Sequence, residues 1–298
     1  MSNVGLIIEE RAADIGNFMV GRLLPFVQKR SIGPFVFIDH MGPKELKAGE
    51  ALDVPPHPHI GLSTLTYLFE GSIMHKDSIG TEMEIAPGAV NWMTAGKGIV
   101  HSERTPDRLR PENKVLHGMQ IWVALPKELE DMEPTFTHVG AESLPAWSDE
   151  DLHFRLIAGE FMEHQSPVPV YSPLYMIEVK TTQGGRVKIG PDLFGEAGLY
   201  ILEGNVEEGG NVHGPQQILI AKDAQLCEFE MHPNTTIYIF GGDALPERRY
   251  LYWNFVASSR ERIEEAKQAW QDQTMGQVPG ETEIVPLPPQ PKNIRLKK

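Results

Sequence analysis

The feature that most constrains this chain is a pair of short motifs whose metal-binding side chains lie two residues apart. His57 and His59 flank a proline, and His101 and Glu103 flank a serine. On a β-strand, side chains two residues apart point to the same face, whereas on a helix they lie on different faces. Each pair can therefore converge on one point only where the chain folds as a strand.

The sequence around both pairs favours β-structure. Residues 62–69 alternate polar and apolar side chains up to a turn at Glu70-Gly71, and the turn at Pro87-Gly88 precedes a strand-like run at 89–93. If the two pairs lie on neighbouring strands, three imidazoles and one carboxylate meet at a single centre. One such pair is a weak signal, but two pairs in strand context predict a metal site.

The predicted ligand set narrows the choice of metal without settling it. It contains no cysteine, which argues against a closed Cys-rich zinc site. Imidazole and carboxylate suit Fe(II), Ni, Cu, Mn or Zn, and ligand identity alone does not choose among them. Three neutral imidazoles and one carboxylate leave a divalent ion with a net charge near +1. An open coordination position then favours an anionic oxygen donor such as a phenolate.

Charge and cysteine content exclude several classes of protein. The formal net charge of −14 argues against non-specific binding to nucleic acid and against binding to anionic membranes. The single cysteine, Cys227, excludes an internal disulfide framework and is compatible with a reducing cytosol. No apolar run is long enough for a membrane span, and we find no secretory signal. We therefore expect a soluble cytoplasmic protein.

The 298 residues are enough for two domains, and the 28 glycines and 24 prolines suit a turn-rich β protein. A shift to acidic and proline-punctuated sequence over 126–151 predicts the connection between them. We place an N-terminal metal-binding domain at 1–135, a metal-free domain at 136–276 and a proline-rich tail at 277–298. Seven short strands are expected in the second domain, at 152–158, 174–180, 186–189, 198–203, 216–221, 225–231 and 235–240.

One helix is predicted over 258–270, because Ser258 and Glu261 form a capping-box pattern and apolar residues recur at helical spacing. His213 and His232 in the second domain stand alone, so we expect that domain to bind no metal. In the first domain, we interpret His75 as a surface side chain and His117 as a core or outer-sphere residue. His40, beside Asp39 at a strand end, is expected to make a structural hydrogen bond.

The sequence resembles the pirin family of the cupin superfamily. The resemblance is dense over 20–126, thinner to about residue 270, and carried by the segments 56–61, 66–71, 91–103 and 116–126. It implies an all-β fold of two cupin-type antiparallel barrels with a short C-terminal helix, and one metal in the N-terminal barrel. That metal is often iron, with Ni, Cu, Mn, Co or Zn as alternatives.

Carried over position by position, the resemblance makes His57, His59, His101 and Glu103 the metal ligands. For bacterial members it implies quercetin 2,3-dioxygenase activity. One residue departs from the pattern: many cupins have a glutamate four residues after the second histidine, where this chain has Ser63. Any role of a second acid near the site is therefore in doubt.

Two functional hypotheses follow. In the first, the protein is a metal-dependent dioxygenase that cleaves a flavonol or a similar aromatic substrate with O2. Glu103 then serves both as a ligand and as the catalytic base that takes a proton from the substrate. In the second, the protein is a binding or regulatory module in which the metal's redox state alters a surface that contacts a partner protein. The resemblance allows this, because eukaryotic pirins are thought of as transcription cofactors. A vestigial metal protein is a third, weaker interpretation, and the oligomeric state is not assigned.

Overall fold

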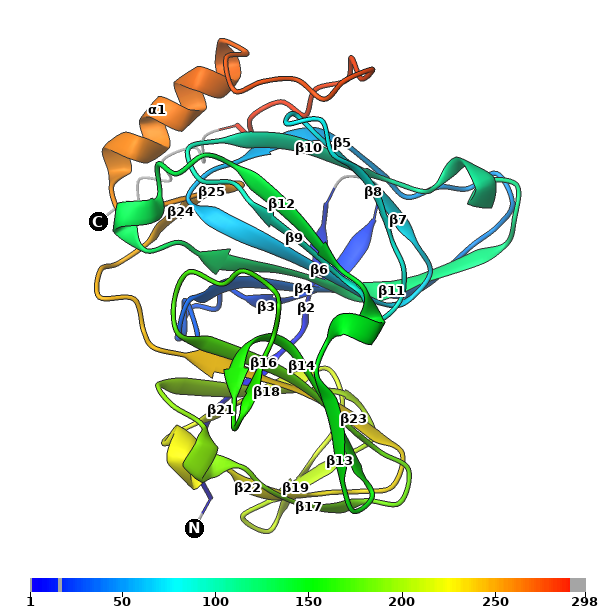
Figure 1. Cartoon of the computed structure of the whole chain (residues 1–298), viewed down its shortest axis with the longest axis vertical. Coiled ribbons are helices and arrows are strands. Elements are labelled where there is room, and N and C mark those ends of the chain that lie inside the picture. Colours follow the sequence, from blue (N-terminus) through cyan, green and yellow to red (C-terminus); the bar gives the residue numbers. More distant parts are fainter. Residues whose placement is uncertain (1, 16–17, 290–298) are drawn as a thin grey trace, which may run out of the picture.

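The structure is a computed structural model that describes residues 2–15 and 18–289. Most of the described strands form a stack of four antiparallel sheets, with the two largest sheets in the middle, and a two-stranded sheet lies outside this stack (Figure 1). Two sheets belong to the first half of the chain and two to the second half. The sequence-based prediction of an all-β chain in two domains is therefore confirmed.

The first domain pairs a seven-stranded sheet with a four-stranded sheet. The larger sheet has the strand order β12 (Thr135–Val139), β9 (Val90–Thr94), β6 (Leu62–Glu70), β11 (Lys114–Ala124), β4 (Phe35–Leu46), β3 (Met19–Leu24) and β2 (Arg11–Asp14). The smaller sheet, in the outer layer, has the order β5 (Asp53–His59), β10 (Ile99–Arg104), β7 (Ile73–Asp77) and β8 (Glu82–Ile85).

The second domain repeats this arrangement with an eight-stranded and a four-stranded sheet. The larger sheet has the order β1 (Val4–Glu9), β21 (Gln217–Ala221), β18 (Glu196–Glu203), β23 (Thr235–Gly242), β16 (Leu174–Thr181), β14 (Leu152–Phe161) and β13 (Ala146–Asp149), with β15 (His164–Gln165) paired to β14. The smaller sheet has the order β17 (Gly185–Lys188), β22 (Glu228–Met231), β19 (Val206–Glu208) and β20 (Asn211–His213). All seven predicted strands of this domain are present, but the one predicted over 225–231 begins only at Glu228, because residues 224–226 form a 3-10 helix.

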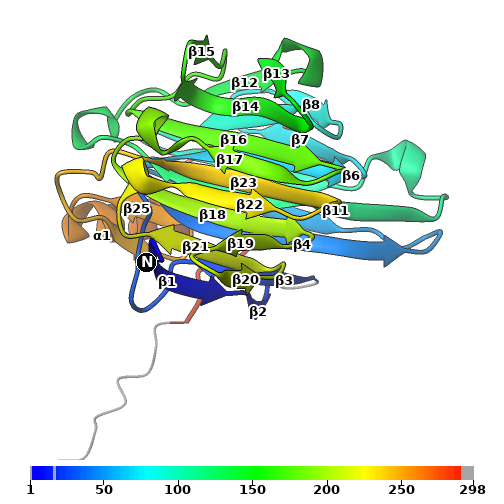
Figure 2. The same cartoon turned by 90° about the horizontal axis from the view of Figure 1, so that it is seen from below.

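The two ends of the chain are exchanged between the domains. The N-terminal strand β1 pairs with β21 at the edge of the second domain, as Figure 2 shows from below. The C-terminal segment instead returns to the first domain, where the hairpin of β24 (Tyr250–Tyr252) and β25 (Phe255–Ala257) leads into α1 (Arg260–Gln271). Part of the segment assigned to the second domain from sequence thus packs on the first, and the boundaries at 135 and 276 stay a prediction.

The C-terminal segment covers the outer four-stranded sheet. Phe255 forms a β-bridge with Ile60, and Ile263 and Trp270 of α1 join the same buried cluster. Beyond the helix, the backbone N–H of Val285 donates to the Pro56 carbonyl at 3.1 Å. Because β5 is an edge strand with unpaired backbone groups, this covering satisfies some of them. The described part of the tail, 277–289, therefore lies on its own protein; residues 290–298 are outside the described residues.

One hydrophobic core lies between the two large sheets and joins the domains. It includes Leu65 and Ile121 from the first domain and Met176 from the second. A buried carboxylate is satisfied inside this interface: the hydroxyls of Tyr238 and Tyr67 donate to Glu178 at 2.7 and 3.3 Å. Burying a carboxylate is costly unless it is hydrogen-bonded, so these contacts favour one specific docking of the two sheets.

The predicted helix is confirmed, but its predicted cap is wrong by one residue. The Ser259 hydroxyl, not that of Ser258, accepts a hydrogen bond from the backbone N–H of Arg262 at 3.2 Å. Ser258 instead donates to the carboxylate of Glu130 at 2.9 Å. A tertiary contact thus competes with the local capping pattern. No helix among the described residues has the length and hydropathy needed to cross a membrane.

Replacing the cap tests this assignment. Ser259→Ala should lower the free energy of unfolding by about 1 kcal/mol, because one N–H of the first helical turn loses its acceptor. Ser259→Asp should retain stability, since its carboxylate caps the helix and favours the positive N-terminal end of the dipole. Urea unfolding curves measure both effects. Equal midpoints for the wild-type protein and Ser259→Ala would contradict the assignment.

Candidate metal centre

The predicted ligand pairs lie on adjacent antiparallel strands. Strand β5 carries His57 and His59, and β10 carries His101 and Glu103, with His101 directly opposite His57. The register then shifts, so that Glu103 pairs with Val54. This irregularity falls at the two prolines 55 and 56, which cannot donate ladder hydrogen bonds and are tolerated because β5 is an edge strand.

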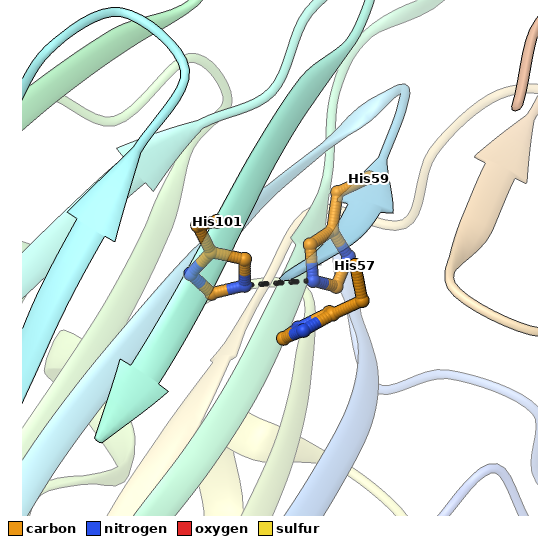
Figure 3. A group of neighbouring side chains, drawn as sticks. All are labelled: His57, His59 and His101. Atoms are coloured by element: carbon orange, nitrogen blue, oxygen red, sulfur yellow. Dashed lines mark hydrogen bonds between the residues drawn. The ribbon is translucent and has the colours of Figure 1, made fainter. Parts of the chain in front are cut away.

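The three imidazoles converge in the interior of the first domain. Their ligand atoms all lie within 4.8 Å of one another, and the Nε2 atoms of His59 and His101 are 3.1 Å apart (Figure 3). Two nitrogens that each sit about 2.1 Å from a metal, at roughly a right angle, are about 3 Å apart. The spacing therefore suits two ligands on one ion. His57 lies 4.4 Å from His101 between ring centroids.

The other ring nitrogen of two of these imidazoles is held by a backbone carbonyl. His57 Nδ1 lies 2.9 Å from the Pro55 oxygen, and His59 Nδ1 lies 3.2 Å from the Asn254 oxygen. A carbonyl can only accept, so each Nδ1 carries the proton and each Nε2 keeps a free lone pair. Outer partners of this kind fix the tautomer of metal-binding histidines.

The carbonyl of Asn254 reaches His59 because the backbone at Gly61 lets the returning C-terminal segment come very close. Gly61 has a φ of +65°, and a Cβ there would lie 2.0 Å from the carbonyl oxygen of Val256. A side chain at this position would displace the returning C-terminal segment. The glycine thus allows a residue far along the chain to hold a predicted ligand.

Burial keeps the three imidazoles neutral. The side chains of His57, His59 and His101 are 8%, 2% and 1% exposed. Burial lowers the pKa of His57 to about 4, and burial together with the neighbouring imidazoles lowers the pKa of His59 and His101 well below the usual value. Neutral imidazole is the form that binds metal, so the site has its ligands ready at pH 7.

Glu103 lies apart from the three-imidazole group, although it shares their strand face. The group of converging ligand atoms comprises the histidines alone. The Thr66 hydroxyl lies 3.5 Å from the Glu103 carboxylate and 2.9 Å from the Gln120 side-chain oxygen. Burial raises the pKa of Glu103, because the charged form is poorly solvated there. The role of Glu103 as a fourth ligand stays a prediction.

The interpretation of His75 as a surface side chain is wrong. It is buried on β7, where its Nδ1 lies 3.3 Å from His101 Nδ1 and its Nε2 lies 3.1 Å from Asp77. Sequence reasoning also passed over Asp77, yet His75 and Asp77 have the same two-residue spacing as the two ligand pairs. That third pair was the signal available in the sequence. The Asn254 carbonyl could not be identified in this way, because every residue has a backbone carbonyl.

His40 and His117 are not at this centre but between the domains. His40 Nδ1 lies 2.7 Å from Glu10 and its Nε2 lies 2.8 Å from His117 Nε2, while Tyr200 of the second domain donates to Glu10 at 2.6 Å. His40 therefore makes the structural contacts expected of it, but with Glu10 and not with Asp39. The absence of metal from the second domain stays a prediction.

Aromatic side chains border the centre on the side of the large sheet. The Trp122 ring meets His59 edge-on at 5.2 Å, and Phe37 stacks on Trp122 with centroids 3.9 Å apart. Ser63, which stands where many cupins have a glutamate, shares a hydrogen bond of 3.0 Å with Thr94. The Trp122 ring thus borders His59, and Phe37 fixes the orientation of that ring.

Comparison with known proteins agrees with this architecture. The pirin family model matches residues 17–123, and the model of the pirin C-terminal cupin domain matches 176–276. A pirin-like protein of Caulobacter vibrioides is 44% identical over 290 residues, which cover 96% of this chain and 99% of that protein. A solved quercetin 2,3-dioxygenase from Acinetobacter baumannii is 34% identical, with a TM-score of 0.87 over 97% of each chain.

A bacterial pirin from Escherichia coli, solved in complex with nickel(II), is 18% identical with a TM-score of 0.59, over 80% of this chain and 99% of that one. At this identity the match shows the fold alone. Two stacked β domains with three buried imidazoles in the first define a protein of the cupin type. With the matches above, the chain belongs to the pirin family.

The residues present fit a divalent transition metal. Three neutral imidazoles place their ligand atoms within 4.8 Å of one another, with the Nε2 atoms of His59 and His101 3.1 Å apart, and no thiolate competes for a softer metal. Members of this family bind such an ion. The donor set does not select one metal among them.

The three histidines should be individually necessary for metal binding. Replacing His57, His59 or His101 by Ala should weaken the binding of added Ni(II) or Fe(II) by more than about 100-fold, the upper end of the loss seen for outer-sphere partners alone. Elemental analysis after loading and gel filtration measures the bound metal. His232→Ala, at a half-buried position of the second domain, is the control. Undiminished metal in any of the three variants would contradict the site.

The metal-free protein should lose stability as the pH falls from about 6.5 to about 4. Unfolded histidines titrate near 6.5, whereas burial lowers the pKa of His57 and of His117 to about 4. The unfolded chain thus binds more protons than the folded chain in this window. The free energy of unfolding therefore decreases as the pH is lowered. For His57 alone the loss is on the order of 3 kcal/mol.

Urea unfolding of the metal-free protein at a series of pH values measures this dependence. His57→Gln, which has no titrating group at that position, should give a flatter profile between pH 6.5 and 4. A wild-type stability that stays constant or rises as the pH falls through this window would contradict the assignment.

Proposed function

We propose that this protein is a metal-dependent dioxygenase that cleaves a flavonol such as quercetin with O2. The observation that carries the proposal is the set of three buried, neutral imidazoles whose Nε2 atoms converge beside an aromatic wall. The likeness to the solved quercetin 2,3-dioxygenase over nearly the whole chain supports it. Fe(II) is the proposed metal, with Ni, Cu, Mn, Co and Zn as alternatives.

His57, His59 and His101 would hold the metal through Nε2, with Glu103 as the proposed fourth ligand. When bound, the ion supplies a Lewis-acidic centre that favours the deprotonated form of a substrate hydroxyl. Trp122, edge-on to His59, and Phe37, stacked on Trp122, form the apolar aromatic side of the site. The small aromatic substrate and O2 are therefore the proposed partners.

Glu103 is the proposed catalytic base. It shares the strand face of His101, and burial raises its pKa, which makes the carboxylate a stronger base. The Thr66 hydroxyl can donate to only one acceptor at a time, and its contact with Gln120 is shorter than its contact with Glu103. The carboxylate is therefore only weakly engaged by Thr66 and can accept the proton of the substrate hydroxyl.

Turnover of quercetin tests the activity and the base together. Metal-loaded wild-type protein should consume quercetin and O2, followed by ultraviolet absorption and an oxygen electrode. Glu103→Gln should lower kcat by about 100-fold or more, because general bases contribute on that scale. Its metal affinity should fall less than its kcat.

Glu112→Gln, an exposed acid in a nearby loop, is the matched control and should retain full turnover. Unchanged quercetin absorption in the wild-type protein across Fe(II), Ni, Cu, Mn, Co and Zn would overturn the proposed activity.

One observation favours a second candidate function, a redox-sensitive module that binds a protein partner. Ser102 and Arg104, which alternate with the predicted ligands on β10, both bond to Glu281 of the C-terminal tail. A change at the metal could thus alter the surface formed by this tail. A partner that binds only the Fe(III) form, together with no turnover of any phenol, would favour this function.

The remaining assignments complete the proposal. The facing sheets of each domain are proposed to be cupin-type barrels, with metal in the first and none in the second. The domain boundaries at 135 and 276 are proposed from the shift in composition over 126–151 and the proline-rich tail. A cytoplasmic location is proposed from the single cysteine.

A further inference from the structure

A buried histidine–aspartate pair extends from one of the three imidazoles. Strand β7 pairs with β10, so that Asp77 lies opposite His101 and His75 lies opposite Glu103. Both side chains are enclosed, with exposures of 4% for His75 and 0% for Asp77. The ring of Phe136 stacks on His75 at 4.6 Å and restrains its orientation.

The hydrogen bonds of this pair allow one arrangement of protons when a metal is bound. His101 Nε2 faces His59, so its lone pair is the one that binds metal and its Nδ1 carries the proton. That proton points to His75 Nδ1, 3.3 Å away, which must accept it. The proton of His75 is then on Nε2 and is donated to the Asp77 carboxylate at 3.1 Å.

Asp77 is itself held in place. Its second carboxylate oxygen accepts the backbone N–H groups of Ile79 at 3.0 Å and of Thr81 at 2.9 Å, in the turn that joins β7 to β8. The carboxylate therefore has a fixed orientation toward His75. The chain from Asp77 through His75 to His101 is continuous and lies wholly within the protein.

This chain makes the three imidazoles unequal. His57 and His59 donate to the neutral carbonyls of Pro55 and Asn254. His101 donates to an imidazole that is in turn bonded to a carboxylate. A negative charge at the end of a hydrogen-bond chain polarises each bond and makes the first imidazole a stronger electron donor.

We propose that His75 and Asp77 are positioning residues that hold His101 in its metal-binding tautomer and make it the strongest donor of the three imidazoles. The pair increases metal affinity and favours Fe(III) over Fe(II), because a more electron-rich ligand stabilises the higher charge. The inference rests on the metal site of the proposed function, but not on any particular substrate.

Two variants separate the charge from the hydrogen-bond chain. Asp77→Asn keeps a side-chain oxygen that can accept from His75 but removes the charge. His75→Phe removes the link while keeping a ring that stacks on Phe136. Glu82→Gln is the matched control, because it removes a carboxylate from the neighbouring strand β8 where the side chain is 62% exposed and bonded to Lys76.

The readouts are the affinity for Ni(II), measured by competition with a chelator, and the Fe(III)/Fe(II) potential, measured by spectroelectrochemistry without substrate. Asp77→Asn and His75→Phe should each weaken Ni(II) binding by about 10- to 100-fold, the usual cost of losing an outer-sphere partner. Both should raise the potential. Glu82→Gln should leave affinity and potential unchanged.

The potential distinguishes this role from a structural one, since a merely loosened site loses affinity for both oxidation states. Wild-type potentials in both variants would overturn the proposal, even if stability falls. Should Asp77→Asn not fold, because its turn is lost, His75→Phe decides the question alone. If the wild-type protein binds metal but does not consume quercetin, the proposed dioxygenase activity is wrong and this inference still holds.

Discussion

The centre of this protein depends on the pairing of β5 with β10. In that register His101 lies directly opposite His57, and the two-residue periodicity of the strands then brings His59 to the same side. A shift by one residue would turn every ligand to the opposite face, so the register decides whether a site exists at all. Because prolines lack an N–H, β5 can pair with a neighbour on one side only and must be an edge strand. Its other edge is covered by another segment of the chain.

The cover comes from the far end of the chain. The segment from Tyr250 onward returns to the first domain, bridges Ile60, and places the Asn254 carbonyl against His59. Farther on, Glu281 binds Ser102 and Arg104 on the outer side of β10. Because β1 is exchanged in the other direction, neither domain is complete without sequence from the other end of the chain. The three converging histidines thus depend on segments from both ends of the chain.

The environment of the imidazoles is graded and not uniform. His57 and His59 have neutral backbone acceptors, whereas His101 leads through His75 to the buried carboxylate of Asp77. Glu103 lies on the same face with few contacts and a raised pKa. A site that combines neutral nitrogen donors, one charge-linked donor and one loosely held carboxylate suits chemistry in which a metal binds an oxygen donor while a nearby base accepts its proton.

The sequence by itself determined the β class, the helix near the C-terminus, and the strands that carry the three converging histidines. These follow from local periodicity, which any short stretch of chain expresses on its own. The tertiary structure decided what periodicity cannot express. The three histidines form the converging group without Glu103, and the contact of Ser258 with Glu130 leaves the helix cap to Ser259.

Tertiary packing also turned His75 inward and brought the Asn254 carbonyl to His59. Such outcomes depend on the summed packing of strands far apart in sequence, and a backbone carbonyl carries no residue-type signal. His75 and Asp77 had the spacing of a ligand pair, but only the pairing of β7 with β10 placed them behind His101. Local pattern therefore identified the atoms that can bind a metal, and long-range packing decided how those atoms are held.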